Sequence, residues 1–166
     1  MNDLAVIRPT ATPAITIEYF QFEEDFVEDN IRCIPMVVRC KMDIVGIKLS
    51  LAAWVRFTPQ EKDALAQMHV ATPNEIIAYD QYLCGLILNH TGETAARIQS
   101  KDFKWNQQHE VPAELKNKAS EFGWSISLAQ WKTLSNLQRF ALLKLCRPGH
   151  ENRNFPIAVK EFRLYE

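Results

Sequence analysis

Residues 35–65, PMVVRCKMDIVGIKLSLAAWVRFTPQEKDAL, align without a gap on residues 112–142, PAELKNKASEFGWSISLAQWKTLSNLQRFAL. Nine of the 31 aligned positions are identical, among them a proline, a glycine, a Ser-Leu-Ala run and a tryptophan. The proline suits the first turn of a helix, where its missing N–H has no partner to lose, and the glycine suits the left-handed residue that ends one. The chain is therefore predicted to contain an internal repeat, and each copy to be a helix, a tight turn, a short helix and a further helix.

Capping signals place the helix starts within both copies. A serine or threonine followed three residues later by glutamate or glutamine forms a capping box, in which each side chain bonds the backbone N–H of the other residue. The predicted caps are Ser50 and Ser127 for the short helices, with Gln130 completing the second, and the pairs Thr58–Glu61 and Ser135–Gln138 for the helices that follow. Trp54 and Trp131 then fall on the inner face of equivalent elements.

Outside the repeat, Thr72 and Pro73 start a helix that Gly92 ends, and a last helix begins near Pro156. That last helix has Ile157, Ala158, Phe162 and Tyr165 as candidates for burial. The alternating stretch ITIEYFQF (15–22) allows a short N-terminal strand. The sequence thus predicts a mostly α fold, with a single helical domain over 15–166 after a mobile N-terminal arm, 1–14. The domain is made of two related halves, about 15–92 and 111–166, joined by a polar linker, 93–110, in which Trp105 is the anchor.

The composition is that of a soluble globular protein, with 47% hydrophobic residues, 23% charged residues and a net charge of −1. No apolar run approaches the roughly 20 residues that cross a bilayer, and residues 1–14 do not resemble a secretory signal. The four cysteines form no CxxC pair, so reduced thiols in a cytoplasmic protein are predicted. Neither a nucleic acid nor a membrane is an expected partner.

Charge is unevenly distributed along the chain. Six acidic residues and no basic one lie between Arg8 and Arg32, whereas Gln138–Arg163 contains six basic residues. Either the two ends meet within the fold, or one of them presents a charged face to a partner.

The polar turn LCRPGHENRNFP (145–156) allows two interpretations. As a helix-ending turn, it would use Pro148 to stop the helix, Gly149 to reverse the chain and Asn152 or Asn154 to cap the next helix. As a contact surface, it would direct its polar side chains at a partner or an anionic ligand; these are Arg147, His150, Glu151, Asn152, Arg153 and Asn154. The other copy of the repeat turns through the bland HVATP, so the fold alone does not require such a cluster.

No pattern in the chain indicates catalysis. GxSxG, P-loop and GxGxxG motifs are absent, and Cys33 beside Arg32 has no base placed for it. Cys146 and His150 are four residues apart, but Pro148 and Gly149 break the helix that would bring them together on a metal ion. We therefore predict a non-enzymatic protein with no cofactor and no metal.

Several longer segments carry a family resemblance: FQFEEDF (20–26), RCIPMVVRCKMD (32–43), GIKLSLAAW (46–54), QRFALLKLCRPGHENRNF (138–155) and KEF (160–162). Together they resemble the nitrate reductase-associated protein family, also described as nitrate reductase maturation proteins. The resemblance implies a small cytoplasmic protein that helps assimilatory nitrate reductase become active and does not itself reduce nitrate. It makes contact candidates of Arg32, Cys33, Pro35, Met36, Arg39 and Lys41 in the first half, and of Arg139, Arg147, Pro148, Gly149, His150, Glu151, Asn154 and Phe155 in the second.

Three functions follow from these observations. The first is a non-enzymatic maturation factor that binds nitrate reductase or a molybdenum-cofactor delivery protein. The alternative is a protein that binds a small anionic, molybdopterin-like ligand, with the 147–154 loop as its site. The third is an accessory module with a different partner.

Overall fold

The computed structural model describes residues 12–23, 33–99, 103–149 and 153–165, which form a mostly α-helical fold, as predicted. The eight α-helices of these residues are α2 (Met36–Val45), α3 (Leu51–Trp54), α4 (Pro59–Gln67), α5 (Pro73–Thr91), α6 (Ala113–Ser120), α7 (Leu128–Thr133), α8 (Asn136–Leu145) and α9 (Phe155–Glu161). Two short 3-10 helices, η1 (Gln21–Glu23) and η2 (Lys104–Asn106), precede α2 and α6.

The predicted repeat is present in the structure as α2–α3–α4 and α6–α7–α8. Gly46 and Gly123 both adopt left-handed backbone, with φ of 82° and 72°, after the first helix of each copy. Ser50 caps α3, and reciprocal capping boxes start α4, α7 and α8 at Thr58, Ser127 and Ser135. Because these contacts are all made within a few residues, the same local sequence forms the same local structure twice.

The two tryptophans of the repeat are both fully buried, and each has a cationic side chain over its ring. Nζ of Lys62 lies 5.4 Å from the centre of the Trp54 ring, and Cζ of Arg139 lies 5.7 Å from that of Trp131. Lys62 and Arg139 occupy equivalent positions in the two copies, so the repeat extends to a packing contact in the core.

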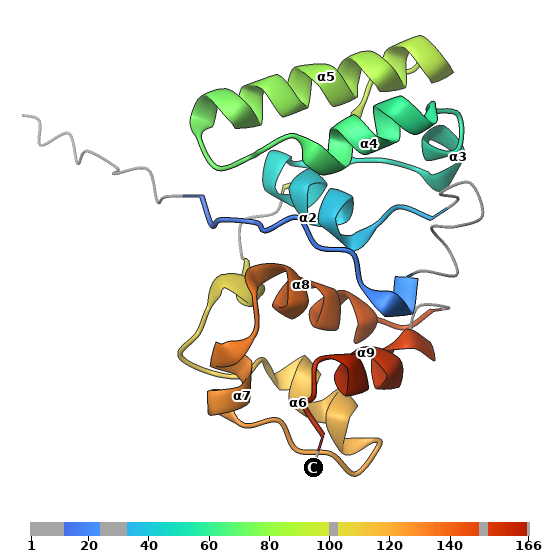
Figure 1. The fold of residues 1–166 in the computed structure, drawn as a ribbon. Coiled ribbons are helices and arrows are strands. Elements are labelled where there is room, and N and C mark those ends of the chain that lie inside the picture. Colours follow the sequence, from blue (N-terminus) through green and yellow to red (C-terminus); the bar gives the residue numbers. More distant parts are fainter. Residues whose placement is uncertain (1–11, 24–32, 100–102, 150–152, 166) are drawn as a thin grey trace, which may run out of the picture.

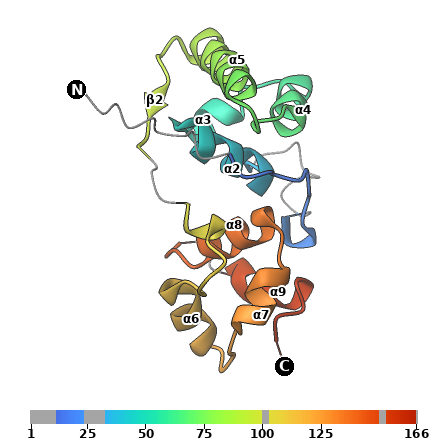
Figure 2. The same cartoon turned by 90° about the vertical axis from the view of Figure 1, so that its left-hand side faces the viewer.

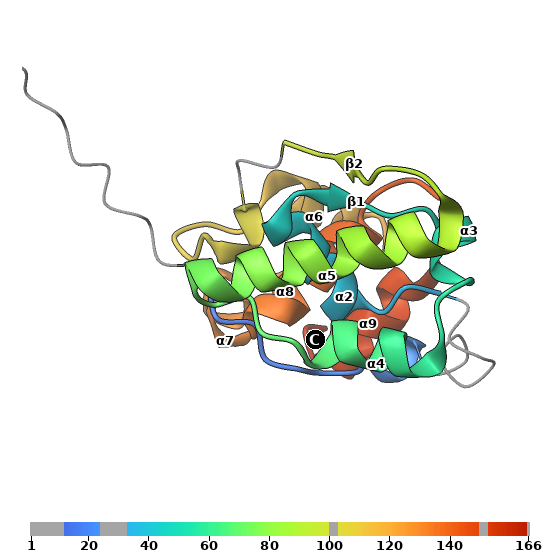
Figure 3. The same ribbon diagram turned by 90° about the horizontal axis from the view of Figure 1, so that it is seen from above.

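The two halves lie one above the other in Figure 1, with α2 and α8 between them. An ion pair joins these helices, since Nζ of Lys144 is 2.8 Å from Oδ2 of Asp43. Because α2 is the first helix of its copy and α8 the third of its own, the halves meet through helices that are not equivalent. Helix α5 packs on α2 and α3 and forms the uppermost layer in Figure 3.

The segment between the halves makes two attachments. Strand β2 (Ala96–Arg97) pairs antiparallel with β1 (Ile47–Lys48), and Figure 2 shows β2 at one edge of the upper half. Trp105 is 5% exposed, and its carbonyl accepts a 2.7 Å hydrogen bond from Nε of Arg139. The prediction that Trp105 anchors this segment is confirmed.

The N-terminal strand predicted over 15–22 is wrong. Residues 12–20 pair with no strand among the described residues, and the segment ends in η1, whose amides of Gln21 and Phe22 donate to the Glu161 carboxylate of α9. Phe20 packs edge-on against Phe162, with ring centres 5.1 Å apart, so a hydrophobic contact replaces the expected ladder.

These contacts, with a 2.7 Å bond from Ser135 to Glu18, bring the two ends of the described chain together. The mobile arm remains a prediction, since residues 1–11 lie outside the described part.

Burial in the last helix was predicted only in part. Ala158 is fully buried and Phe162 is half-buried, but Ile157 and Tyr165 are 51% and 48% exposed. Those two predictions are wrong because α9 buries only the side that faces α8 and η1.

Candidate functional site

A cavity of about 680 Å³ opens at the junction of the two halves, between α2 and α8. Its apolar walls come from both halves and include Phe22, Ile34, Met36, Met42, Ile47 and Leu145. Cavities of roughly 300–1,000 Å³ with mostly apolar walls and a few polar groups are the usual binding sites for small molecules.

The structure brings four of the predicted contact residues together at this cavity. Cys33 and Arg39 line it from the first half, and Arg147 and Asn154 line it from the second. Arg147 is exposed, whereas Arg39 is half-buried and its Nε donates a 2.9 Å hydrogen bond to the carbonyl of Ile34. Two sequence segments more than a hundred residues apart therefore contact the same cavity.

The described part of the 145–156 turn differs from the capping interpretation at one residue. Asn154 occupies the N-cap position of α9, but its side chain makes no capping hydrogen bond. The side chain lines the cavity instead. Arg153 is exposed and is not among the residues that line the cavity. Four further candidates, Arg32, His150, Glu151 and Asn152, lie outside the described residues.

Lys41 and Arg139, two of the family-motif candidates, lie in the core rather than at the surface. Lys41 is 1% exposed, and its Nζ donates to the carbonyls of Ala66 and Met68 at 2.5 and 2.6 Å. Burial lowers the pKa of Lys41 to about 8. These carbonyls end α4, where a cation complements the helix dipole.

Arg139 is 2% exposed and is also occupied within the fold. Besides the bond to Trp105, its guanidinium donates to the carbonyl of Leu134 at 2.8 Å and to Oδ1 of Asn136 at 2.5 Å. The expectation that Lys41 and Arg139 contact a partner is therefore corrected, because both stabilise the fold from within.

Glu23 also lines the cavity, and the sequence analysis did not identify it. The residue is 8% exposed, and its Oε1 accepts a 2.7 Å hydrogen bond from the Met36 amide, while Oε2 has no hydrogen-bond partner among the described residues. Burial raises the pKa of Glu23 to about 7, against the opposing charge of Arg39. Glu23 belongs to an acidic run, FEED, and nothing in that run distinguishes a buried carboxylate from exposed ones.

The charges around the cavity are unequal in number. Four lining residues are cationic and two are acidic: Arg39, Lys48, Lys144 and Arg147 against Glu23 and Asp43. Lys144 and Asp43 already form an ion pair, so Arg147 is the exposed cation at the α8 end. A smaller cavity of about 390 Å³ shares Asp43, Lys144 and Arg147 with the first. The arrangement combines apolar walls, one buried acceptor and a cationic rim, which suits binding of an anion with an apolar body.

Two further classes of feature were searched for in the described residues. No three His, Cys, Asp or Glu side chains there lie close enough together to hold a metal ion. In the same residues, no helix combines the length and apolar character that crossing a membrane requires. All four cysteines are free thiols, and burial raises the pKa of Cys146 to about 12.

Comparison with known proteins identifies the family. The family model described as conserved nitrate reductase-associated protein matches residues 19–162, which include η1, every described α-helix and the cavity. Searches of curated proteins and of solved structures found no match. Because the matched region covers most of the chain, the protein belongs to the conserved nitrate reductase-associated protein family.

Proposed function

We propose that the chain is a non-enzymatic accessory factor of the cytoplasm that assists the maturation of assimilatory nitrate reductase. It would do so by binding the reductase itself or a protein that delivers the molybdenum cofactor. The observation that carries this proposal is the family match, since the family is described as associated with the reductase and not as the reductase. A maturation role gives that association a purpose.

The contact surface is proposed to lie around Arg147, at the rim of the cavity. Arg147 is exposed and lies where the two motif segments converge. An exposed arginine suits recognition of a carboxylate on a partner, because its planar guanidinium can donate two parallel hydrogen bonds.

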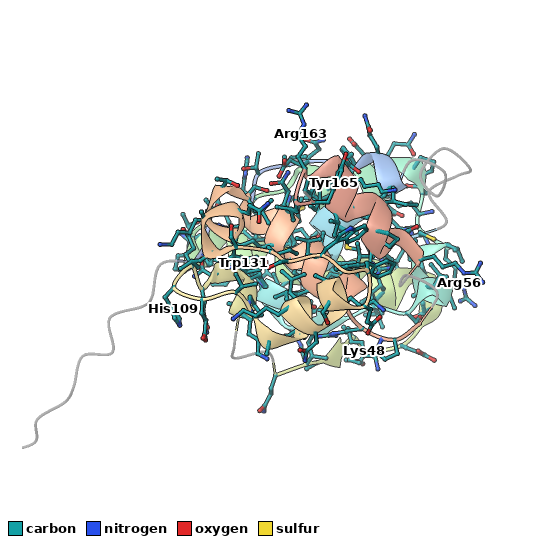
Figure 4. All side chains as sticks on the ribbon, turned by 90° about the horizontal axis from the view of Figure 1, so that it is seen from below. Lys48, Arg56, His109, Trp131, Arg163 and Tyr165 are labelled. Carbon is teal, nitrogen blue, oxygen red and sulfur yellow. The ribbon has the colours of Figure 1, made fainter. Side chains whose placement is uncertain are left out.

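The test is capture of purified nitrate reductase by the immobilised full chain. The wild type is compared with Arg147→Glu and with Arg163→Glu, a matched control. Arg163 is exposed too, and Figure 4 places it at the opposite edge of the molecule from Lys48, which lines the cavity. Arg147→Glu is expected to weaken capture by about tenfold or more, because charge reversal replaces an attraction with a repulsion, while Arg163→Glu leaves capture unchanged.

A second arm tests the biological role. Deletion of the coding sequence is expected to lower nitrate reductase activity in nitrate-grown cells without lowering the amount of reductase protein. If deletion left that activity intact, and the wild type captured neither the reductase nor a cofactor-delivery protein, the maturation role would be refuted.

A further inference from the structure

Oε2 of Glu23 has no hydrogen-bond partner among the described residues, although Glu23 is more than nine-tenths buried and lines the cavity. A buried carboxylate oxygen without a donor is unfavourable, and most buried polar atoms in native proteins have a partner. The other oxygen, Oε1, is already occupied by the Met36 amide. Oε2 is therefore free to accept one hydrogen bond from a group that enters the cavity.

The rest of the cavity restricts what that group belongs to. The cationic residues on the lining outnumber the acidic ones, which favours a ligand with negative charge. Arg147 is exposed at one end, and an arginine fork pairs well with phosphate. The thioethers of Met36 and Met42 lie on the wall, and methionine sulfur makes favourable contacts with aromatic rings.

We propose that this cavity binds a phosphorylated heterocycle of mononucleotide size. A ring N–H or amino group of the ligand donates to Oε2 of Glu23, the ring lies against the two methionines, and the phosphate pairs with Arg147. The volume of about 680 Å³ suits such a molecule. The inference goes beyond the proposed docking of a protein, since it concerns the interior of the cavity and not its rim.

The binding test uses the purified full chain alone, at pH 8, so its result does not depend on any reductase. The probes are guanosine 5′-monophosphate and flavin mononucleotide, which both carry a ring N–H and a phosphate. Guanosine, riboflavin and inorganic phosphate are the matched controls that lack one of the two groups. Calorimetric titration is expected to give saturable binding of at least one phosphorylated probe with a Kd below about 1 mM. The corresponding unphosphorylated control is expected to bind about tenfold more weakly.

Three variants separate the proposed contacts from nonspecific binding. Glu23→Gln is expected to weaken the probe by about tenfold, because the amide can keep the Met36 bond only by turning its NH₂ donor toward the ligand. Arg147→Ala is expected to weaken it by a similar factor, and Arg163→Ala to leave it unchanged.

Several outcomes would overturn the proposal. One is the absence of saturable binding by both phosphorylated probes up to about 5 mM. Another is inorganic phosphate binding as tightly as the probes, which would make the site a simple anion site. A third is equal affinity in Glu23→Gln, Arg147→Ala and the wild type, which would place the probe elsewhere. Circular dichroism of each variant confirms that it is folded before titration.

Discussion

Replacing Glu23 with glutamine is expected to stabilise the protein at alkaline pH and to leave its stability nearly unchanged at acidic pH. In the folded protein the pKa of this carboxyl is raised from 4.5 to about 7, because burial disfavours the ionised form. The folded state therefore holds the proton more tightly than the unfolded state does. The favourable contribution of the protonated form is complete below about pH 4.5 and is lost as pH rises through about 7.

The size of the effect follows from the separation of the two pKa values. Each pKa unit corresponds to about 1.4 kcal/mol, so a separation of about 2.5 units makes the ionised side chain cost roughly 3 kcal/mol of unfolding free energy above pH 8. Glutamine has no charge to bury, and its amide oxygen can accept the same Met36 N–H. Glu23→Gln should therefore raise the unfolding free energy by up to about 3 kcal/mol at pH 8, or roughly 6–12 °C in Tm, and by little at pH 4.5.

The measurement is urea denaturation followed by tryptophan fluorescence, which the chain's four tryptophans allow, at half-unit steps from pH 4.5 to 8.5. Glu93→Gln, which changes an exposed carboxylate, is the control and should follow the wild type throughout. The reasoning is refuted if Glu23→Gln lowers stability at pH 8, or if its difference from the wild type does not change between pH 4.5 and 8.

Three other substitutions test contacts in the fold. Gly46→Ala should cost about 2 kcal/mol in chemical denaturation and Gly123→Ala about 1, because both have positive φ but only at Gly46 would the new Cβ meet a backbone oxygen, 3.0 Å away; equal losses would contradict this. Lys41→Met should abolish a rise in unfolding free energy between about pH 8 and 10.5, since the lowered pKa of Lys41 means that the folded state binds fewer protons in that range; an unchanged difference from the wild type across it would contradict the assignment. Arg139→Met should cost about 3 kcal/mol or more, because it leaves buried carbonyls without donors; a loss below about 1 kcal/mol would contradict it.

Local structure was predicted well from the sequence, because its causes lie within a few residues. The capping boxes at Thr58, Ser127 and Ser135 each need only two side chains three positions apart. Gly92 ends α5 in left-handed backbone, as predicted, because a residue without Cβ reaches that conformation at no steric cost.

The candidate site was predicted only in part, because its geometry depends on how the halves pack. The sequence indicated Arg147 and Asn154 through an unusual polar turn, but it could not show that α8 would place them opposite Cys33 and Arg39. Burial of Glu23 likewise depends on contacts with the distant α2 and α9. The N-terminal alternation was misread for a related reason, since a strand needs a neighbouring strand and this segment meets a helix instead.

The repeat itself separates residues that hold the fold from residues that form the candidate site. An offset of 77 relates Gly46 to Gly123, Ser50 to Ser127, Trp54 to Trp131 and Lys62 to Arg139, and each pair has the same structural role in both halves. The same offset relates Asp43 to Ser120, Lys144 to Gln67 and Arg147 to Val70, so these charged residues at the cavity have no charged counterpart. Because α2 and α8 are not equivalent, their contact creates a surface that occurs once in the molecule. The repeat therefore explains how the chain folds, and the departures from it mark where we expect the chain to bind.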